Sequence, residues 1–379
     1  MSTDESRARG AVAALFFVNG AMTGNLVPRF PDLKGELELS NTAFGSAVGA
    51  YGLGALALGL LGGLLVRRFG SRRVAWVSSV AIAANLTLIG LAPAWLALAA
   101  VLAVAGALDS YADIGANAHG LRVERIYGRS ILNSLHGVWS IGAVVGGSIG
   151  SAAAGLDIAV ELHLAAAAGL FAAVAVGASQ FLLRGPDAAE AAAPGGHVRL
   201  AHGIVALGLI AAMAQTMEDT TAAWGGVYLR EELGAAAAVG GLGFIALQST
   251  QTVGRLLGDR VVTRYGDRAV ARAGAGLACL SMAVALAVPG IAITVIAFGL
   301  VGAGIGTLIP AAMRSADRML PNGMGLMLVG TVLRIALLVA PPLVGVVADA
   351  ASLRVALIVM PAGAALVILL VGALSDGGR

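Results

Sequence analysis

The sequence is poor in charged residues, aromatic residues and cysteine. Of its 379 residues, 12% are charged and 5% are aromatic. Soluble domains contain about 25% charged residues, so this composition excludes an ordinary soluble globular protein. The single cysteine, Cys279, excludes an intramolecular disulfide. The net charge of +3 comes mostly from arginines in short loops, a pattern that does not indicate nucleic-acid binding.

Motifs of several catalytic and energy-coupling classes are also missing. The sequence has no P-loop of the form G-x-x-x-x-G-K-[ST], which excludes an ATP-driven pump on this chain alone. Its histidine, cysteine and carboxylate residues lack the spacings of a metal cluster or a nucleophile–base pair. We therefore expect no metal, no cofactor and no enzymatic activity.

Apolar residues dominate the sequence instead. They make up 58% of it, and 54 residues are glycine. An apolar helix of about 20 residues spans a bilayer, and small residues let such helices pack closely. The pattern predicts an all-α polytopic membrane protein with twelve transmembrane helices and a first helix that is retained rather than cleaved. The expected segments are 9–30, 43–66, 74–92, 95–121, 130–155, 162–183, 201–229, 236–259, 269–288, 291–314, 324–348 and 353–374.

The distribution of basic residues predicts the orientation of these segments. With the N-terminus in the cytoplasm, 19 basic residues lie inside and 4 outside, and Arg334 lies within a span. The positive-inside rule therefore predicts cytoplasmic N- and C-termini. A hydrophilic stretch divides the segments six and six. We expect an N-terminal bundle at 1–183, a cytoplasmic linker at 184–200 and a C-terminal bundle at 201–379.

A short basic motif occurs once in each half. The run RRFGSRR (67–73) follows the second segment, and TRYGDRA (263–269) follows the eighth, with a constant offset of 196 positions. Two halves with the same loop after their second helix indicate a parallel duplication about an axis normal to the membrane.

These loops resemble the signature of the major facilitator superfamily, which has the form G-x-L-x-D-R-x-G-R-R. In the first copy Arg67 replaces the acid and Ser71 replaces a basic residue, whereas the second copy keeps an acid. The matching residues are Gly63, Leu65, Arg68, Gly70 and Arg72, then Gly258, Asp259, Arg260, Arg264, Gly266 and Arg268. The resemblance implies two six-helix bundles in the major facilitator fold. It also implies a cytoplasmic gate formed by Arg68, Gly70, Arg72, Asp259, Arg264 and Gly266.

Three further runs resemble one bacterial group of this superfamily, related to fucose permeases and other sugar permeases. They are DIGANAHGLRVE (113–124), GRSILNSLHGVWSIG (128–142) and EDTTAAWGGVYLREELG (218–234). The resemblance implies a transporter of the bacterial cytoplasmic membrane. The glycines of segment 130–155 partly resemble the antiporter motif of drug exporters, which keeps export open as the alternative.

Ionisable groups within the apolar segments are the candidate functional residues, because their burial in lipid is costly without a cavity or a partner. Asp109, Asp113 and Asn117 recur at every fourth position and so share one helix face. We expect the proton to bind at Asp109, Asp113 and His136, since a carboxylate beside an imidazole titrates near physiological pH. The expected cargo contacts are Asn117, Asn133 and Trp139. In the structural alternatives the acids pair with neighbouring helices, His136 binds a carbonyl and Trp139 fills an interface.

The second half carries its own charged centre. Arg334 lies about 15 Å into segment 324–348, where a guanidinium needs an acidic partner or an anionic cargo. We expect it to pair with Glu218 or Asp219, either as a permanent ion pair or as a coupling element. Glu218 recurs in the resembled group, which makes it the candidate for proton coupling. The remaining expected cargo contacts are Asn19, Asn25, Asp219, Gln248, Gln251 and Arg334.

Together these residues predict a secondary transporter that works by alternating access. The leading hypothesis is proton-coupled uptake of a sugar-like or other small polar solute. The alternative is proton-coupled export of drugs or other amphiphilic compounds. The expected partners are the solute, protons and the lipid bilayer, and we expect a monomer.

Overall fold

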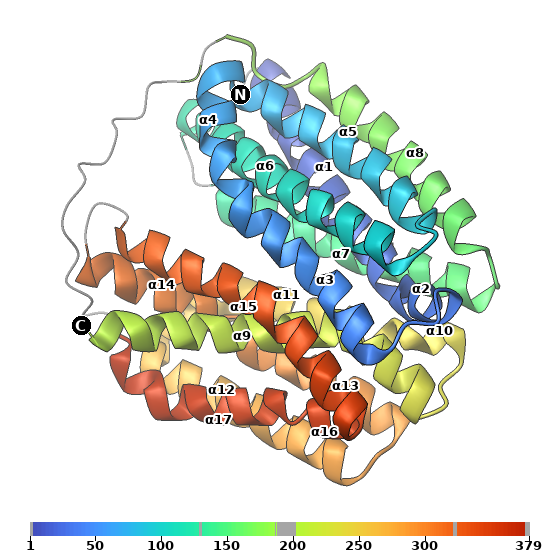
Figure 1. Cartoon of the computed structure of the whole chain (residues 1–379). Coiled ribbons are helices and arrows are strands. Elements are labelled where there is room, and N and C mark those ends of the chain that lie inside the picture. The colour runs from blue at the N-terminus through green and yellow to red at the C-terminus, as the bar shows by residue number, and fades with distance from the viewer. Residues whose placement is uncertain (1–2, 129–130, 186, 188–201, 321–323, 376–379) are drawn as a thin grey trace. The chain divides into compact units, whose positions relative to one another are not determined.

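The computed structural model describes residues 3–128, 131–185, 187, 202–320 and 324–375, with side chains for all of these except 3–5, 60, 133, 202 and 259. Every regular element in these ranges is helical, and the elements fall into twelve consecutive groups (Figure 1). The predicted all-α class and the predicted twelve helices are therefore confirmed.

The first six groups fill the N-terminal half of the sequence. A break in the first group contains Pro28, which lacks an amide hydrogen and cannot continue an α-helical ladder. The second group is bent by 51° between its two helices. The elements are α1 (Thr3–Leu26), η1 (Val27–Arg29) and α2 (Phe30–Glu36); α3 (Asn41–Ala57), η2 (Gly59–Leu61) and α4 (Gly62–Phe69); α5 (Ser71–Gly90); α6 (Trp95–Tyr127); α7 (Leu132–Gly155); and α8 (Val160–Ser179).

The last six groups repeat this arrangement. The first of them ends in a π-helical turn, η3 (Tyr228–Glu232), instead of a second helix. The elements are α9 (His202–Val227) and η3; α10 (Ala237–Gly240) and α11 (Leu242–Tyr265); α12 (Asp267–Ala287); α13 (Ile291–Ile305) and α14 (Leu308–Met319); α15 (Met324–Ala350); and α16 (Leu353–Ala356), α17 (Val359–Leu370) and η4 (Val371–Ala373).

Two of the twelve groups are less apolar than the others. In the described chain, nine helical segments are long and apolar enough to cross a membrane, or ten when the bent pair α3 and α4 counts as one span. The two groups outside this set contain α9 and α11. Both carry polar side chains within the helix, namely Gln215, Glu218, Asp219, Gln248 and Gln251. Such residues in a membrane helix mark a functional site.

Backbone contacts divide the chain into two compact units. Unit 1 comprises Met1–Leu39, Ser46–Ala189 and Ala236–Leu242, and unit 2 comprises Ser40–Gly45, Glu190–Ala235 and Gly243–Arg379. Along the sequence, the boundary between the two units at residues 189 and 190 falls within the segment expected to be a linker. Two short segments, 40–45 and 236–242, are exceptions, because each belongs to the unit that is formed mainly by the other half of the sequence. In unit 1, α1 packs on α7, and α5 packs on α6 and α8; in unit 2, α9 packs on α15, and α12 packs on α13 and α17.

The internal repeat extends beyond the basic loops. Gly70 and Gly266 precede α5 and α12 with φ of 83° and 82°, a backbone conformation that favours glycine. A Cβ atom on Gly106 would overlap the Tyr51 carbonyl in unit 1, and one on Gly302 would overlap the Leu247 carbonyl in unit 2. Both relations keep the offset of 196 positions, so equivalent helix crossings occur in the two halves.

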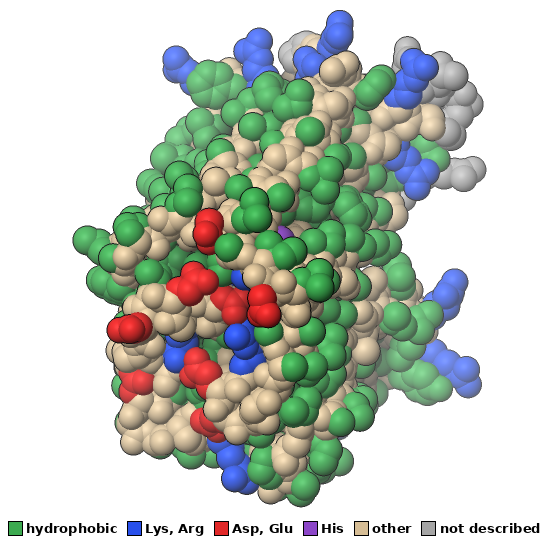
Figure 2. All heavy atoms as spheres, turned by 90° about the vertical axis from the view of Figure 1, so that its right-hand side faces the viewer, with side chains coloured by type: hydrophobic (Ala, Val, Ile, Leu, Met, Phe, Trp, Pro, Cys, Tyr) green, Lys and Arg blue, Asp and Glu red, His purple; other side chains and the backbone are tan. Residues whose placement is uncertain are grey.

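Both acidic and basic side chains reach the face of the structure that Figure 2 shows. The orientation in the membrane, which rests on the basic residues of the sequence, stays a prediction.

Candidate functional site

Two helices of unit 1, α1 and α7, cross so closely that glycine is required along both of them. A Cβ atom on Gly20 of α1 would overlap the backbone carbonyl of Trp139, and one on Gly142 of α7 would overlap the backbone of α1. Gly24 and Gly146 make similar approaches one turn further along. Small residues permit such contacts between membrane helices. Gly146, one of the glycines that resemble an antiporter motif, thus has a packing role, and the close crossing brings the polar residues of the two helices together.

Asn19 of α1 links two of the predicted site residues. Its side-chain amide donates a hydrogen bond to Asp109 Oδ1 at 2.8 Å, and its Oδ1 accepts one from Trp139 Nε1 at 2.6 Å. The indole N–H is only a donor, so it fixes the amide with its oxygen toward Trp139 and its NH₂ toward Asp109. The side chain of Tyr51 also hydrogen-bonds Asp109. We refer to these four residues as the Asp109 group.

The Asp109 group contains a carboxyl without a cationic partner. Its two hydrogen-bond partners are a neutral amide and a phenol. None of the salt bridges among the described residues involves Asp109. Removing a carboxyl from water disfavours its charged form unless a cation compensates. The arrangement therefore suits a carboxyl that gains and loses a proton.

A second chain of polar residues runs from α6 to α7. Asn117 donates to Asp113 Oδ1 at 2.7 Å, and Asn117 Oδ1 lies 3.2 Å from His136 Nε2. His136 also meets the Phe16 ring edge-to-face, with centroids 5.2 Å apart. Because the amide oxygen accepts, the contact requires a proton on His136 Nε2. The prediction had placed a carboxylate beside an imidazole, whereas the structure inserts Asn117 between them. We refer to Asp113, Asn117 and His136 as the Asp113 group.

The polar residues of α9 and α11 form a separate cluster in unit 2. Glu218 accepts hydrogen bonds from Gln248 at 3.1 Å and from Gln251 at 2.7 Å. Its carboxylate also lies 3.8 Å from the guanidinium of Arg255. The next residue, Asp219, accepts a hydrogen bond at 2.8 Å from Gln215, which lies one turn earlier on α9. The structure thus brings together three predicted residues of α9 and α11 around Glu218.

Several acceptor oxygens of this cluster have no donor. Asp219 Oδ2, Gln248 Oε1 and Gln251 Oε1 are all buried without a hydrogen-bond partner among the described residues. Gln248 and Gln251 are only 2% and 1% exposed. Buried polar atoms are normally paired, and an unpaired one costs free energy. The cluster therefore offers acceptors to a hydroxyl, an ammonium group or water.

The predicted partner of Arg334 is wrong. No ion pair joins Arg334 to Glu218 or Asp219; its hydrogen bond in the described chain is to the Gly330 carbonyl, one turn earlier on α15, at 3.4 Å. Arg255 pairs with Glu218 instead. Arg255 follows Gln251 by four positions and so shares its helix face. That spacing was a usable signal, but Arg255 was counted only as one of the 19 inside basic residues.

Asn25 does not join the other candidates. It is fully buried, donates to the Ala21 carbonyl, and its Oδ1 contacts His163 Nε2 at 2.9 Å. Both ends of its amide are therefore used to tie α1 to α8, which argues against the predicted cargo contact. His163 carried no sequence signal beyond being a histidine within an apolar run. The side chain of Asn133 lies outside the described residues.

Arginines of the two basic motifs anchor the loops to their own units. Arg72 donates to the Ser179 carbonyl at 2.8 Å in unit 1, and Arg268 donates to the Leu374 carbonyl at 2.7 Å in unit 2. Arg68 lies over the ring of Phe69, and Arg264 lies over the ring of Tyr265. The side chain of Asp259 lies outside the described residues. The guanidinium groups of Arg68 and Arg264 thus stack on the ring of the next residue, and the gate itself stays a prediction.

An acid from the start of the linker binds the first loop. Asp187 accepts hydrogen bonds from the Ser71 amide and hydroxyl, at 2.5 and 2.8 Å, and lies 3.3 Å from Arg122. His119 contacts the same Ser71 hydroxyl at 3.0 Å. Burial raises the pKa of Asp187, but the Ser71 hydrogen bonds and the Arg122 charge outweigh it and hold the pKa below its ordinary value. The contact with Ser71 gives His119 a structural role beside this loop.

No group of three or more His, Cys, Asp or Glu that could hold a metal ion occurs among the described residues.

The family model of the Major Facilitator Superfamily matches residues 12–210 and 204–376. The uncharacterized transporter y4wD of Sinorhizobium fredii is 30% identical over 372 residues, which cover 96% of this chain and 97% of the relative. The membrane protein MosC of Rhizobium meliloti is 27% identical over 351 residues, which cover 89% of this chain and 83% of MosC.

Solved structures share the fold at low sequence identity. The nucleoside transporter NupG superposes with a TM-score of 0.76 at 13% identity, over 98% of this chain and 99% of NupG. A bacterial homolog of the human lysosomal transporter Spinster, in an inward-facing and occupied conformation, has a TM-score of 0.76 at 13% identity, over 98% of this chain and 96% of that one. At this identity the likeness concerns the fold alone.

Proposed function

Because the chain belongs to the Major Facilitator Superfamily and is therefore a multi-pass membrane transporter, we propose that it takes up a small polar, sugar-like solute together with protons. The proposal includes the cytoplasmic membrane of a bacterium as its location. It also includes cytoplasmic termini, which the ratio of 19 inside to 4 outside basic residues supports. The transport unit is a single chain, since one chain supplies both halves of the repeat.

The observation that carries the proposal is the environment of Asp109. Its carboxyl is held by Asn19 and Tyr51, both neutral, and forms no salt bridge among the described residues. A protonated Asp109 can remain in this setting without a charge, whereas its ionised form needs water nearby. The protonated carboxyl can also donate a hydrogen bond to an oxygen of the cargo, so loading a proton and loading a cargo favour one another at the same carboxyl.

The Asp113 group, on α6 and α7, is a second titratable centre in this proposal. Asn117 connects Asp113 with His136 through two hydrogen bonds. A change in the protonation of either end alters which way the bridging amide can donate and accept. In the proposed cycle His136 and Asp113 exchange the proton with the aqueous side, and Asp109 holds it while the cargo is bound.

The acceptors of unit 2 support a polar cargo over an apolar one. Buried oxygens of Asp219, Gln248 and Gln251 lack donors among the described residues, and the hydroxyl groups of a sugar-like solute can supply them. Glu218 orients both glutamines by accepting their amide hydrogens. An amphiphilic drug would leave most of these oxygens unpaired. The cluster therefore favours uptake of a hydroxylated solute over drug export.

Transport into proteoliposomes under imposed gradients tests the proposal. The purified chain is reconstituted and offered a panel of radiolabelled monosaccharides, polyols and nucleosides, with lipophilic drugs as the competing class. A symporter accumulates solute when the outside is acidic, whatever its insertion direction, and an antiporter accumulates it when the inside is acidic. Accumulation of a polar solute under outside-acidic conditions is the expected result. Accumulation of drugs alone, or transport of every solute without any response to the gradient, would overturn the proposal.

A further inference from the structure

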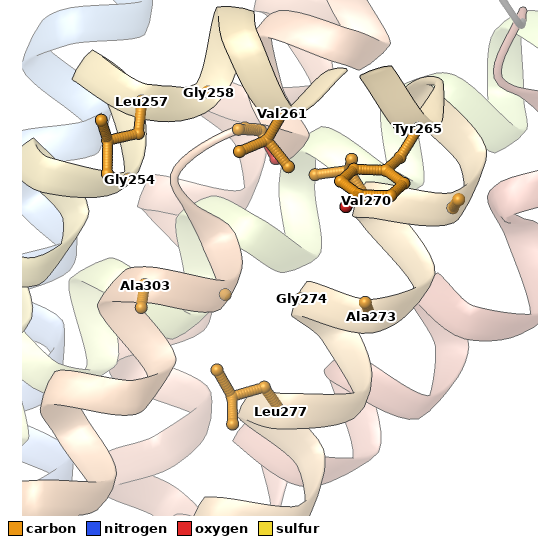
Figure 3. A pocket seen from close by; sticks show the side chains of 13 residues that line it. Gly254, Leu257, Gly258, Val261, Tyr265, Val270, Ala273, Gly274, Leu277 and Ala303 are labelled. Carbon is orange, nitrogen blue, oxygen red and sulfur yellow. The ribbon is translucent and has the colours of Figure 1, made fainter. Parts of the chain in front are cut away.

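Unit 2 contains an apolar groove that is separate from its polar cluster. The groove has a volume of about 520 Å³ and is lined by α11, α12, α13 and the turn that follows α13. Figure 3 shows Val261 and Tyr265 close to Val270 at one end, Leu277 at the other, and Ala273 and Ala303 between them. From Val270 to Leu277 the helix rises by about 10 Å. The floor is formed where the backbones of α12 and α13 touch.

The lining is suited to a hydrocarbon chain. Apart from the Thr307 and Tyr265 hydroxyls, its side chains carry no polar atom, and Tyr265 is 60% exposed. The groove lies along helices α12 and α13, which belong to apolar membrane-spanning segments. An apolar surface at that depth is covered by lipid tails unless protein covers it. The volume is within the range of about 300–1,000 Å³ that small-molecule sites occupy.

The side chains at one position of this groove are smaller than those at the corresponding position of unit 1. In unit 1 a Cβ atom on Gly62 would come within 2.6 Å of Ile114 and 3.4 Å of Tyr111. With the offset of 196 positions, Gly258 corresponds to Gly62 and Thr307 corresponds to Tyr111. A Cβ atom on Gly258 would meet only Thr307, at 2.9 Å. The bulky pair that fills the unit 1 position is therefore absent from unit 2.

A positively charged side chain lies at one end of the groove. The guanidinium of Arg264 lies 5.3 Å from the centre of the Tyr265 ring, and Tyr265 lines the groove. Arg260 lies one turn earlier on α11 and is exposed. Basic residues beside a gap between membrane helices attract anionic lipid headgroups. The arginine end and the apolar floor together match a molecule with an anionic head and a long apolar tail.

We propose that this groove binds an anionic phospholipid, with one acyl chain along α12 and the phosphate at Arg264 and Arg260. The lipid would contact the loop between α11 and α12, which contains Gly266. Its binding would therefore depend on the position of that loop. The proposal is independent of the cargo and of proton coupling.

Photolabelling tests this site directly. The full chain is reconstituted in bilayers that contain phosphatidylglycerol with a diazirine on one acyl chain, and labelled peptides are located by mass spectrometry. We expect labels on α11 and α12 peptides around Val261–Leu277. Replacing Ala273→Phe or Thr307→Tyr, which fills the groove as Tyr111 does in unit 1, should lower this labelling at least fivefold. The matched control Val77→Phe, at the corresponding position of unit 1, should leave it unchanged.

A second variant keeps the test decisive if the filled groove prevents folding. Arg264→Gln should remove the preference for phosphatidylglycerol over phosphatidylcholine but retain basal labelling by the tail. Glycerophosphoglycerol, the same headgroup without acyl chains, should not protect the site, since a free phosphate lacks the tail. Labelling spread evenly over the lipid-facing helices, or an unchanged headgroup preference in Arg264→Gln, would overturn the proposal.

Discussion

Asn19 donates its side-chain amide to Asp109 across 2.8 Å while its own oxygen is held by the indole of Trp139. Asn19 thus links three helices, α1, α6 and α7, and holds the Asp109 carboxyl. The close crossing of α1 and α7 determines this geometry, because Gly20 lies against the Trp139 backbone. A carboxyl that is fixed by neutral donors is the element on which the proposed proton coupling depends.

Asp109→Asn should separate coupling from binding. The amide keeps the size of the side chain but cannot lose a proton, so gradient-driven accumulation should be abolished. Exchange of labelled for unlabelled solute across the membrane, which needs no net proton movement, should persist. Asp157→Asn is the matched control, since Asp157 lies in the loop after α7 and its positive φ of 52° also suits asparagine. Equal loss in both assays would point to a structural role for Asp109.

Trp139→Phe should weaken transport without abolishing it. Phenylalanine retains most of the ring but removes the N–H that orients Asn19. A typical intramolecular hydrogen bond contributes about 1 kcal/mol net, which corresponds to about a fivefold change in a binding constant. The apparent affinity for the solute should fall by about that factor, and the pH profile should shift because Asp109 loses a fixed donor. An unchanged pH profile would show that Trp139 only fills the helix interface.

Glu218 should be energetically coupled to Arg255 and not to Arg334. The Glu218–Arg255 distance is 3.8 Å, whereas Arg334 bonds its own helix. In a double-mutant cycle of thermal unfolding, Glu218→Gln with Arg255→Gln should show an interaction of about 0.5–3 kcal/mol. The matched cycle with Arg334→Gln should be additive. The reverse result would restore the pairing predicted from the sequence.

Gly146→Val should destabilise unit 1 strongly. A Cβ atom there would overlap the Ala21 backbone, which cannot give way as a side chain can. Overpacking typically costs about 1–3 kcal/mol or more, so the melting temperature in detergent should fall and the yield should drop. Gly169→Val in α8 is the control, since nothing lies within 4 Å of the added atom. Similar melting temperatures for the two variants would contradict the close crossing of α1 and α7.

The stabilising effect of Asp187 should be lost in acid. Its folded-state pKa is lowered by Ser71 and Arg122, so its contribution is complete above the ordinary aspartate pKa of about 3.9 and disappears as the pH falls through the lower folded-state value. The melting temperature of Asp187→Asn should be below that of the parent at pH 7, and the difference should shrink toward pH 3. A difference that is constant or grows with acidity would contradict the anchoring role.

The sequence predicts the helices well because each one is encoded locally. Apolar runs of spanning length define the twelve groups, and the recurring glycines at 70 and 266 mark the duplicated turn. The weakest spans by hydropathy, α9 and α11, fall short because they carry the unit 2 cluster. The polar residues that lower the mean hydropathy of these two helices are therefore the same ones that mark them as candidates for function.

Contacts between helices are predicted less well. A sequence shows how far along a helix a residue lies, but it shows less clearly which neighbouring helix the side chain faces. Arg334 lies within α15 as expected, but its side chain hydrogen-bonds within that helix, and the pair with Glu218 does not form among the described residues. Asn25 and Asn19 are both asparagines of α1, yet the side chain of Asn25 contacts His163 of α8. The role of Asn117 as a bridge was not visible either, since it depends on where α7 places His136.

Movement of protons on addition of solute tests the central claim most directly. Proteoliposomes that contain the chain and a trapped pH dye are given the transported sugar-like solute with no gradient imposed. The account predicts acidification of the lumen in the parent protein and in Asp157→Asn, and no pH change in Asp109→Asn despite measurable solute exchange. Solute entry into parent vesicles without any pH change, or an unaltered signal in Asp109→Asn, would contradict it.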